Sequence, residues 1–105
     1  MNIIIIEDEE NNAEDLRQNI LKHNPNAKIV ALLKSVKESI EYLQKHEQPD
    51  LFISDIELGD GLSFEIFEAI RTTAPVIFVT AYNEYALAAF KANGIDYILK
   101  LLMQK

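Results

Sequence analysis

The chain contains no cysteine, which excludes disulfides and metal sites built from thiolates. This absence is typical of a reducing compartment, so we expect a cytoplasmic location. No apolar run approaches the roughly 18 residues that a membrane-spanning helix needs. The start, Met1-Asn2-Ile3, carries no basic segment, and no signal peptide is expected. The sequence therefore disfavours a disulfide-bonded secreted protein and a membrane protein.

Basic residues are scarce relative to acidic ones, with 10 Lys and Arg against 17 Asp and Glu and a net charge of −7. Binding to a nucleic-acid backbone needs clustered Lys and Arg, so direct nucleic-acid binding by this domain is not expected. Part of the acidity lies in the run at residues 7–10. Such a run is also compatible with the solvated start of a helix.

Strand and helix patterns alternate along the 105 residues, which have the size of one domain and contain no linker or repeat. The expected strands are residues 3–6, 28–33, 51–54, 76–79 and 96–99. The expected helices are residues 10–23, 35–46, 62–72 and 83–92. Ser35 is expected to cap the second helix in a capping box with Glu38. This alternation predicts an α/β domain with a parallel sheet covered by helices on both faces.

Polar residues follow four of the expected strands: Glu7 and Asp8, then Asp55, Thr80 and Lys100. If these strands are parallel neighbours, their carboxyl ends meet at one edge of the sheet. Clustered carboxylates repel one another unless a cation compensates, and a hard divalent ion such as Mg²⁺ suits oxygen ligands. A hydroxyl and an ammonium group suit a phosphoryl group, and an aspartate nucleophile would form an acyl phosphate. The strand ends therefore indicate a site for Mg²⁺ and phosphoryl chemistry.

Taken singly, each of these residues also has an ordinary structural interpretation. Asp8 could cap the first helix, and Asp55 could be an acidic turn residue. Thr80 could be an unremarkable strand end, Lys100 a surface charge and Tyr97 a filling residue. Their succession on consecutive strand ends favours one shared site.

This arrangement resembles a bacterial response-regulator receiver domain over nearly the whole chain. The residues that carry the resemblance are 3–9, 55–61, 80–81 and 96–100. The run at residues 80–90 resembles receivers of the LytTR-type (LytR/AlgR-like) subfamily, whose usual partner is a C-terminal DNA-binding domain. The resemblance implies a flavodoxin-like (CheY-like) doubly wound fold with a five-stranded parallel sheet, and a single receiver domain at residues 1–105.

The resemblance also implies a role for each acidic residue. Asp55 would be the phosphoacceptor, and a sensor histidine kinase would be the donor. Asp8 would be the principal Mg²⁺ carboxylate, with Glu7 as the second residue of the acidic pocket. The backbone carbonyl of Glu57 would be the remaining protein ligand of the metal ion.

Three further residues would read the phosphorylation. By the resemblance, Thr80 would hydrogen-bond the phosphoryl group and Lys100 would pair with it. Tyr97 would be the aromatic switch that repacks a protein–protein surface, which in turn would control an output domain. The domain would be a switch rather than an enzyme, able to catalyse only its own phosphorylation and dephosphorylation.

The chain departs from the family at its C-terminal end. The family lysine is normally followed by proline, often through a cis peptide, whereas Leu101 follows Lys100; a non-proline cis bond costs about 2.5–4 kcal/mol. Five residues follow Lys100, too few for the usual fifth helix. We therefore expect a receiver that lacks this helix and the output domain. The apolar surface so exposed predicts self-association as a dimer, with a domain swap as one form.

Two other functions remain open. A phosphoryl-handling hydrolase would need a second acid two residues after the nucleophile, and Glu57 occupies that position. Gly59, however, replaces the threonine of the usual pattern in those enzymes. The other alternative is a degenerate receiver that acts only as an interaction module.

Overall fold

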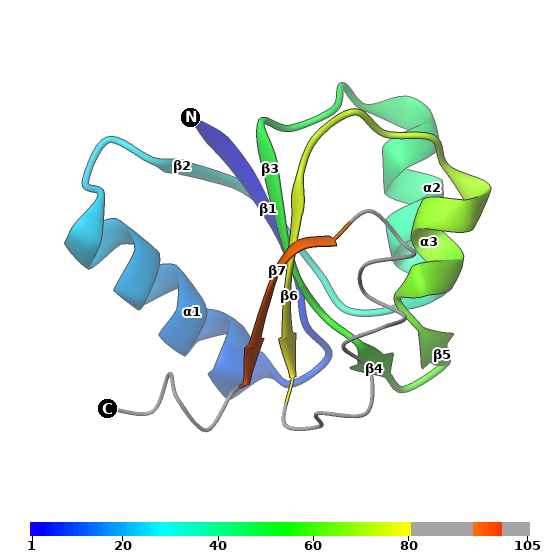
Figure 1. Ribbon diagram of the computed structural model, residues 1–105, viewed down its shortest axis with the longest axis horizontal. Coiled ribbons are helices and arrows are strands. Elements are labelled where there is room, and N and C mark those ends of the chain that lie inside the picture. Colours follow the sequence, from blue (N-terminus) through cyan, green and yellow to red (C-terminus); the bar gives the residue numbers. More distant parts are fainter. Residues whose placement is uncertain (81–93, 100–105) are drawn as a thin grey trace.

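The computed structural model describes residues 1–80 and 94–99, of which Thr80 and residues 94–99 are described by their backbone. A five-stranded parallel sheet with the order β2-β1-β3-β6-β7 forms its centre (Figure 1). Its strands are β1 (Asn2–Ile6), β2 (Lys28–Leu33), β3 (Leu51–Asp55), β6 (Val76–Thr80) and β7 (Gly94–Leu99). Each of these begins and ends within two residues of the prediction.

Helices cover both faces of the sheet. Helix α1 (Glu10–His23) lies on one face, and α2 (Val36–Lys45) and α3 (Phe64–Ala69) lie on the other (Figure 1). The chain runs outward from β1 to β2 and then returns to place β3 on the other side of β1. Because crossovers between parallel strands are right-handed, this reversal sends the following helices to the opposite face. The predicted doubly wound α/β fold is confirmed.

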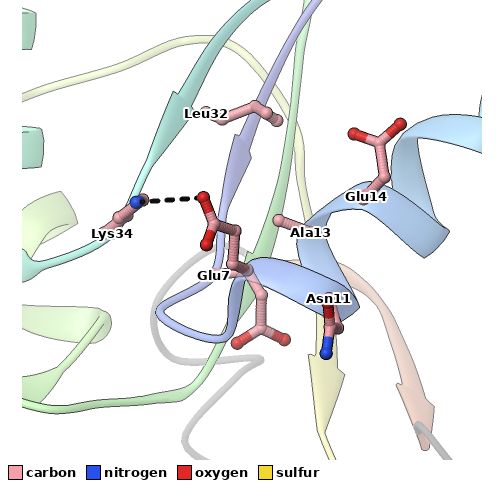
Figure 2. Close-up of a pocket in the computed structure, with 7 residues that line it drawn as sticks. Glu7, Asn11, Ala13, Glu14, Leu32 and Lys34 are labelled. Atoms are coloured by element: carbon pink, nitrogen blue, oxygen red, sulfur yellow. Dashed lines mark ion pairs between the residues drawn. The ribbon is translucent and has the colours of Figure 1, made fainter.

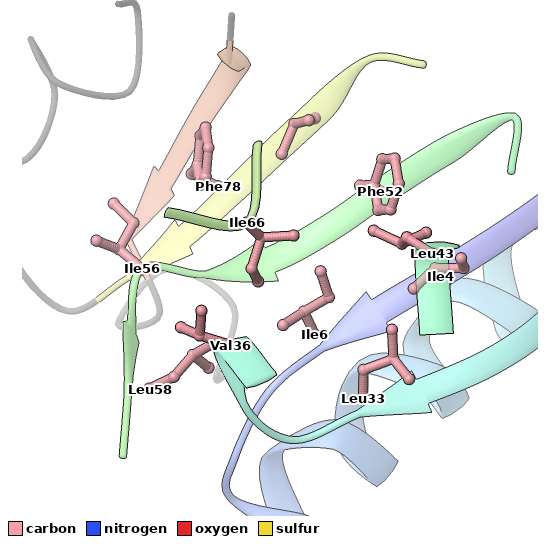
Figure 3. Packing of buried hydrophobic residues seen from close by; sticks show 11 residues of the cluster. Ile4, Ile6, Leu33, Val36, Leu43, Phe52, Ile56, Leu58, Ile66 and Phe78 are labelled. Atoms are coloured by element: carbon pink, nitrogen blue, oxygen red, sulfur yellow. The ribbon is translucent and has the colours of Figure 1, made fainter. Parts of the chain in front are cut away.

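The strand side chains alternate between two hydrophobic clusters. Ile4 and Ile6 point toward α2 and α3 and belong to a cluster with Phe52 and Phe78 (Figure 3). Ile3 and Ile5 belong to the cluster on the α1 face. Burial on both faces explains the continuous apolar run of β1, the second strand of the sheet. Complete burial of one such side chain contributes about 1.5–3 kcal/mol to the free energy of unfolding.

The segment after β3 differs from the prediction. Residues 57–62 form an antiparallel hairpin of β4 (Glu57–Leu58) and β5 (Gly61–Leu62), where only turns were expected. The third helix, predicted over residues 62–72, is limited to Phe64–Ala69. Strand pairing occupies Leu62, and Ile70 has extended dihedral angles, so the helix begins later and ends earlier.

The other two helices have the predicted bounds within a residue. Ser35 caps α2, and its Oγ accepts a hydrogen bond from Glu38 N at 3.0 Å. The predicted fourth helix and the end of the chain after Leu99 lie outside the described residues. Within the described part, no helix is both long and apolar enough to cross a membrane.

Candidate functional site

Three carboxylates meet where β1 and β3 end. Strands β1 and β3 are parallel neighbours with Ile6 paired to Ser54, so Glu7 and Asp8 emerge beside Asp55. One carboxylate oxygen from each of the three acids lies within 4.8 Å of the others. We call Glu7, Asp8 and Asp55 the acidic cluster. It lies at the point where the sheet's winding reverses, the usual ligand site of open α/β sheets.

The three acids differ in their surroundings. Glu7 and Asp55 are buried, with 1% and 6% of their surface exposed, whereas Asp8 is exposed. Asp55 Oδ1 accepts a hydrogen bond from Ile56 N at 2.7 Å, and Glu7 Oε2 accepts one from Glu9 N at 3.2 Å. Main-chain donors therefore orient the two buried carboxylates, and Asp8 opens the cluster to solvent.

Asp8 does not cap the first helix. The residue before α1 is Glu9, whose side chain makes no capping hydrogen bond. The structural interpretation of Asp8 as a helix cap is therefore wrong, and its carboxylate is placed in the acidic cluster instead.

The donor set of the acidic cluster fits a hard divalent cation. Three negative groups within this distance repel one another, and a bound cation relieves the repulsion. All the side-chain donors are carboxylate oxygens, which Mg²⁺ and Ca²⁺ prefer. Mg²⁺ keeps several waters and needs few protein ligands, and the exposed side at Asp8 leaves room for them. The cluster is therefore able to hold the predicted ion.

The hairpin β4–β5 borders the acidic cluster. Glu57 begins it two residues after Asp55 and is exposed. At the turn, a Cβ added to Gly59 would lie 3.8 Å from Asp8 Oδ2. The turn of the hairpin therefore lies close to the most accessible acid.

A pocket of about 310 Å³ adjoins the cluster on the α1 side and is lined in part by Glu7. Figure 2 shows it between α1, which contributes Ala13 and Glu14, and the end of β2. Lys34 Nζ lies 3.8 Å from Glu10 Oε1 at this pocket, and both side chains are largely exposed. An exposed ion pair of this kind stabilises the fold by at most about 1 kcal/mol.

The backbone register places two other predicted site residues. Asp55 pairs with Val79 across β3 and β6, so Thr80 follows at the same edge of the sheet. Thr80 pairs with Leu99 of β7, and Tyr97 pairs with Phe78. Lys100 and Leu101 lie outside the described residues.

Sequence reasoning missed the role of Asp60. Its Oδ1 accepts a hydrogen bond from Val36 N at 2.8 Å, and its Oδ2 accepts one from Lys37 N at 3.0 Å. The hydrogen bonds from Val36 N–H and then Lys37 N–H hold the pKa of Asp60 below its usual value of 3.8. An acidic residue between two glycines indicated a turn, but no local signal points to a helix that begins 24 residues earlier.

The fold and the site define a class: a flavodoxin-like α/β domain with an acidic cluster at the switch point of its sheet. The family model of the response regulator receiver domain matches residues 3–105. The chain belongs to this family and is the receiver domain of a two-component response regulator.

Curated relatives agree with this family. The chain is 39% identical over 103 residues to the sensory transduction protein LytT of Enterococcus faecalis, covering 95% of this chain and 42% of the relative. It is 36% identical over 74 residues to the transcriptional regulatory protein LytR of Staphylococcus aureus, covering 68% and 30%. The chain thus spans less than half the length of these relatives. The resemblance to LytTR-type receivers is confirmed.

Solved structures show the same fold. The response regulatory domain of mrkE from Klebsiella pneumoniae superposes with a TM-score of 0.84 at 28% identity, covering 95% of this chain and 83% of that one. A two-component response regulator from Clostridium difficile gives a TM-score of 0.80 at 26% identity, with 95% and 83% covered. The predicted CheY-like fold is confirmed.

Proposed function

We propose that Asp55 accepts a phosphoryl group from a phosphohistidine of a sensor kinase, in a reaction that requires Mg²⁺ at the acidic cluster. The observation that carries this proposal is the convergence of Glu7, Asp8 and Asp55 within 4.8 Å at the carboxyl edge of the sheet. Membership of the receiver family supports it, because receivers bind Mg²⁺ at an acidic pocket.

In the proposed reaction, a carboxylate oxygen of Asp55 attacks the phosphorus atom and forms a new O–P bond. The N–P bond of the donor breaks, and the imidazole nitrogen keeps the electron pair. The hydrogen bond from Ile56 N restrains the Asp55 carboxylate during the attack. Asp8, Asp55 and the backbone carbonyl of Glu57 would hold the metal ion, with Glu7 behind them. When bound, Mg²⁺ supplies charge neutralisation for the carboxylates and the incoming phosphoryl oxygens.

The roles of the residues that would respond to phosphorylation remain predictions. Thr80 would hydrogen-bond the phosphoryl group and Lys100 would pair with it. Their support is the register, which brings the ends of β6 and β7 to the edge that holds Asp55. Tyr97 would change rotamer and repack the surface that controls a DNA-binding output domain. On this proposal the domain is a switch and catalyses no reaction beyond its own phosphorylation and dephosphorylation.

Several other predictions remain part of this proposal. They are a single receiver domain at residues 1–105, a cytoplasmic location and self-association as a dimer. Receivers interact with sensor kinases and some of them dimerise, which supports a sensor kinase and a second copy of the chain as partners.

The proposal is tested by incubating the protein with a small-molecule phosphodonor, with and without Mg²⁺. Intact-mass spectrometry should show one added phosphoryl group in the wild type, only with Mg²⁺. The modification should be lost in Asp55→Ala and strongly slowed in Asp8→Asn. Asp15→Asn, which removes an exposed carboxylate of α1, is the matched control and should behave as the wild type.

Two outcomes would contradict the proposal. Multiple turnover of an added phosphoester would indicate the hydrolase alternative. A complete lack of both Mg²⁺ binding and phosphorylation would indicate a degenerate receiver that serves only as an interaction module.

A further inference from the structure

Asp60 connects two parts of the molecule that are distant in sequence. The hairpin register pairs Glu57 with Leu62 and Leu58 with Gly61, which leaves Gly59 and Asp60 as the two turn residues. The Asp60 carboxylate accepts hydrogen bonds from the first two amides of α2, at 2.8 and 3.0 Å. These hydrogen bonds therefore attach the turn to the start of α2.

The cap of α2 is shared between a local and a distant residue. Ser35 Oγ accepts a hydrogen bond from Glu38 N, the third amide of the helix. Asp60 takes the two amides before it, those of Val36 and Lys37. The first amides of a helix lack partners within the helix, so an acceptor from elsewhere stabilises its start. The negative charge of Asp60 also interacts favourably with the helix dipole.

The other turn residue faces the acidic cluster. A Cβ added to Gly59 would lie 3.8 Å from Asp8 Oδ2, in ordinary van der Waals contact, so this position of the turn is close to that carboxylate. Of two consecutive turn residues, Gly59 thus lies near the proposed metal site, and Asp60 accepts hydrogen bonds from the first turn of α2.

Apolar packing beneath the turn keeps these contacts together. Leu58 and Val36 are both buried, belong to the same hydrophobic cluster and lie next to each other in Figure 3. The hairpin and the start of α2 therefore share one packed base, with the Asp60 hydrogen bonds on its exposed side. A shift of the hairpin would change both the surroundings of Asp8 and the cap of α2.

We infer that Asp60 is a positioning residue that couples cation binding at the acidic cluster to the docking of α2. The inference rests on the proposed Mg²⁺ site. The hydrogen bonds between Asp60 and α2 hold the hairpin beside Asp8. The hairpin is therefore already ordered before a cation binds, and binding costs less conformational entropy. Coupling between two sites is reciprocal, so a bound cation equally strengthens the attachment of α2.

The test measures Mg²⁺ affinity by NMR titration of the wild type, Asp60→Ala, Asp60→Asn and Asp50→Ala. Asp50 is the matched control, because its Oδ2 also accepts a main-chain hydrogen bond, from Asn2 N at 2.6 Å, but at the amino ends of the strands. We expect the Kd for Mg²⁺ to rise about fivefold or more in Asp60→Ala. Asp60→Asn, which keeps one acceptor oxygen, should show a smaller rise, and Asp50→Ala should match the wild type.

Hydrogen exchange gives a second measurement that does not depend on phosphorylation. In the wild type, Mg²⁺ should slow exchange of the Val36 and Lys37 amides, which Asp60 binds. The slowing should be absent in Asp8→Asn and reduced in both Asp60 variants. A merely structural cap would protect these amides equally with and without Mg²⁺.

The outcomes separate this inference from the proposed function. If the wild type binds Mg²⁺ and a folded Asp60 variant binds it with the same affinity, the coupling is wrong and the metal site stands. If the wild type binds no Mg²⁺, both are wrong. Should Asp60→Ala fail to fold, the folded Asp60→Asn variant decides by the same comparison.

Discussion

Glu7 and Asp8 are neighbours in sequence, yet their carboxylates have opposite exposures. Glu7 continues the alternation of β1 and is buried on the side of α1, as its place in the pocket beside Ala13 shows. Asp8 follows where the strand has ended and is exposed. A step of one residue at the end of the strand therefore decides which acid is buried in the protein and which one is exposed to solvent.

Asp60 should make the free energy of unfolding depend on pH in a defined direction. The hydrogen bonds from Val36 N–H and Lys37 N–H lower its pKa in the folded protein below the usual 3.8. Its stabilising contribution is therefore fully present above the usual pKa and is lost as the pH falls through the folded pKa. We expect the stability difference between wild type and Asp60→Asn to be constant at neutral pH and to shrink below pH 3.8.

Urea denaturation of both proteins across an acidic pH series measures this difference. Other carboxylates lower the stability of both proteins in acid, and the comparison removes their contribution. A difference that stays constant to the lowest pH at which both proteins fold would contradict the assignment of Asp60 as a charged cap.

At the scale of elements, the β4–β5 hairpin is the part that local patterns described least well. Its two strands have two residues each, too short for a periodicity to be recognised. Leu62 was assigned to the third helix because it starts an apolar pattern, whereas it pairs with Glu57. Leu62 N donates its hydrogen bond to Glu65 Oε2 at 3.0 Å, and the helix begins at Phe64, after the second strand of the hairpin. Strand pairing has here overridden helical propensity.

Gly61→Ala should destabilise this hairpin. Gly61 has a φ of +148°, a conformation that residues with a side chain rarely adopt, and an added Cβ would lie 2.5 Å from Glu65 Oε2. The Glu65 side chain can move away only by losing its hydrogen bond from Leu62 N, so this loss adds to a backbone strain of about 1–3 kcal/mol. Thermal or urea unfolding measures it.

Gly59→Ala is the matched control for this change. Its Cβ would make only an ordinary contact at 3.8 Å, and Gly59 has no positive φ. We expect it to cost less than Gly61→Ala. Equal costs at the two positions would mean that the left-handed conformation of Gly61 is not what the hairpin requires.

At the scale of the whole molecule, one sheet separates two hydrophobic clusters, and both depend on the same strands. The cluster facing α2 and α3 contains Phe52, and the cluster facing α1 contains Ile53, the next residue of β3. Asp55 ends that strand. The position of the acidic cluster is therefore tied to the packing on both faces of the sheet.

Phe52→Ala should lower the free energy of unfolding by about 3–5 kcal/mol. Phe52 is fully buried and meets Phe67 edge to face, with ring centroids 5.2 Å apart. Small domains are stable by only about 5–15 kcal/mol, so this change removes a large share of the total. Leu32→Ala, at a side chain that is 40% exposed, is the control and should cost much less. Similar midpoints of urea denaturation for the two variants would contradict the description of the core.

The sequence by itself determined the alternation of strands and helices, the bounds of α1 and α2 and the placement of Asp55 at a strand end. Each of these follows from spacing within about 10–15 residues: a period near 2 in strands, near 3.6 in helices, and a capping serine. The resemblance to receivers added the roles of Thr80, Tyr97 and Lys100. Those roles stay predictions.

Only the tertiary structure decided which strand ends meet and what holds them. The strand order places β1 beside β3, which brings Glu7 and Asp8 to Asp55. The cap of α2 by Asp60 likewise joins residues 24 positions apart. Such contacts arise when packing of the two hydrophobic clusters brings distant segments together, and no local pattern encodes them. For this reason the acidic residues of the site were predictable, and the hydrogen bonds from α2 to Asp60 were not.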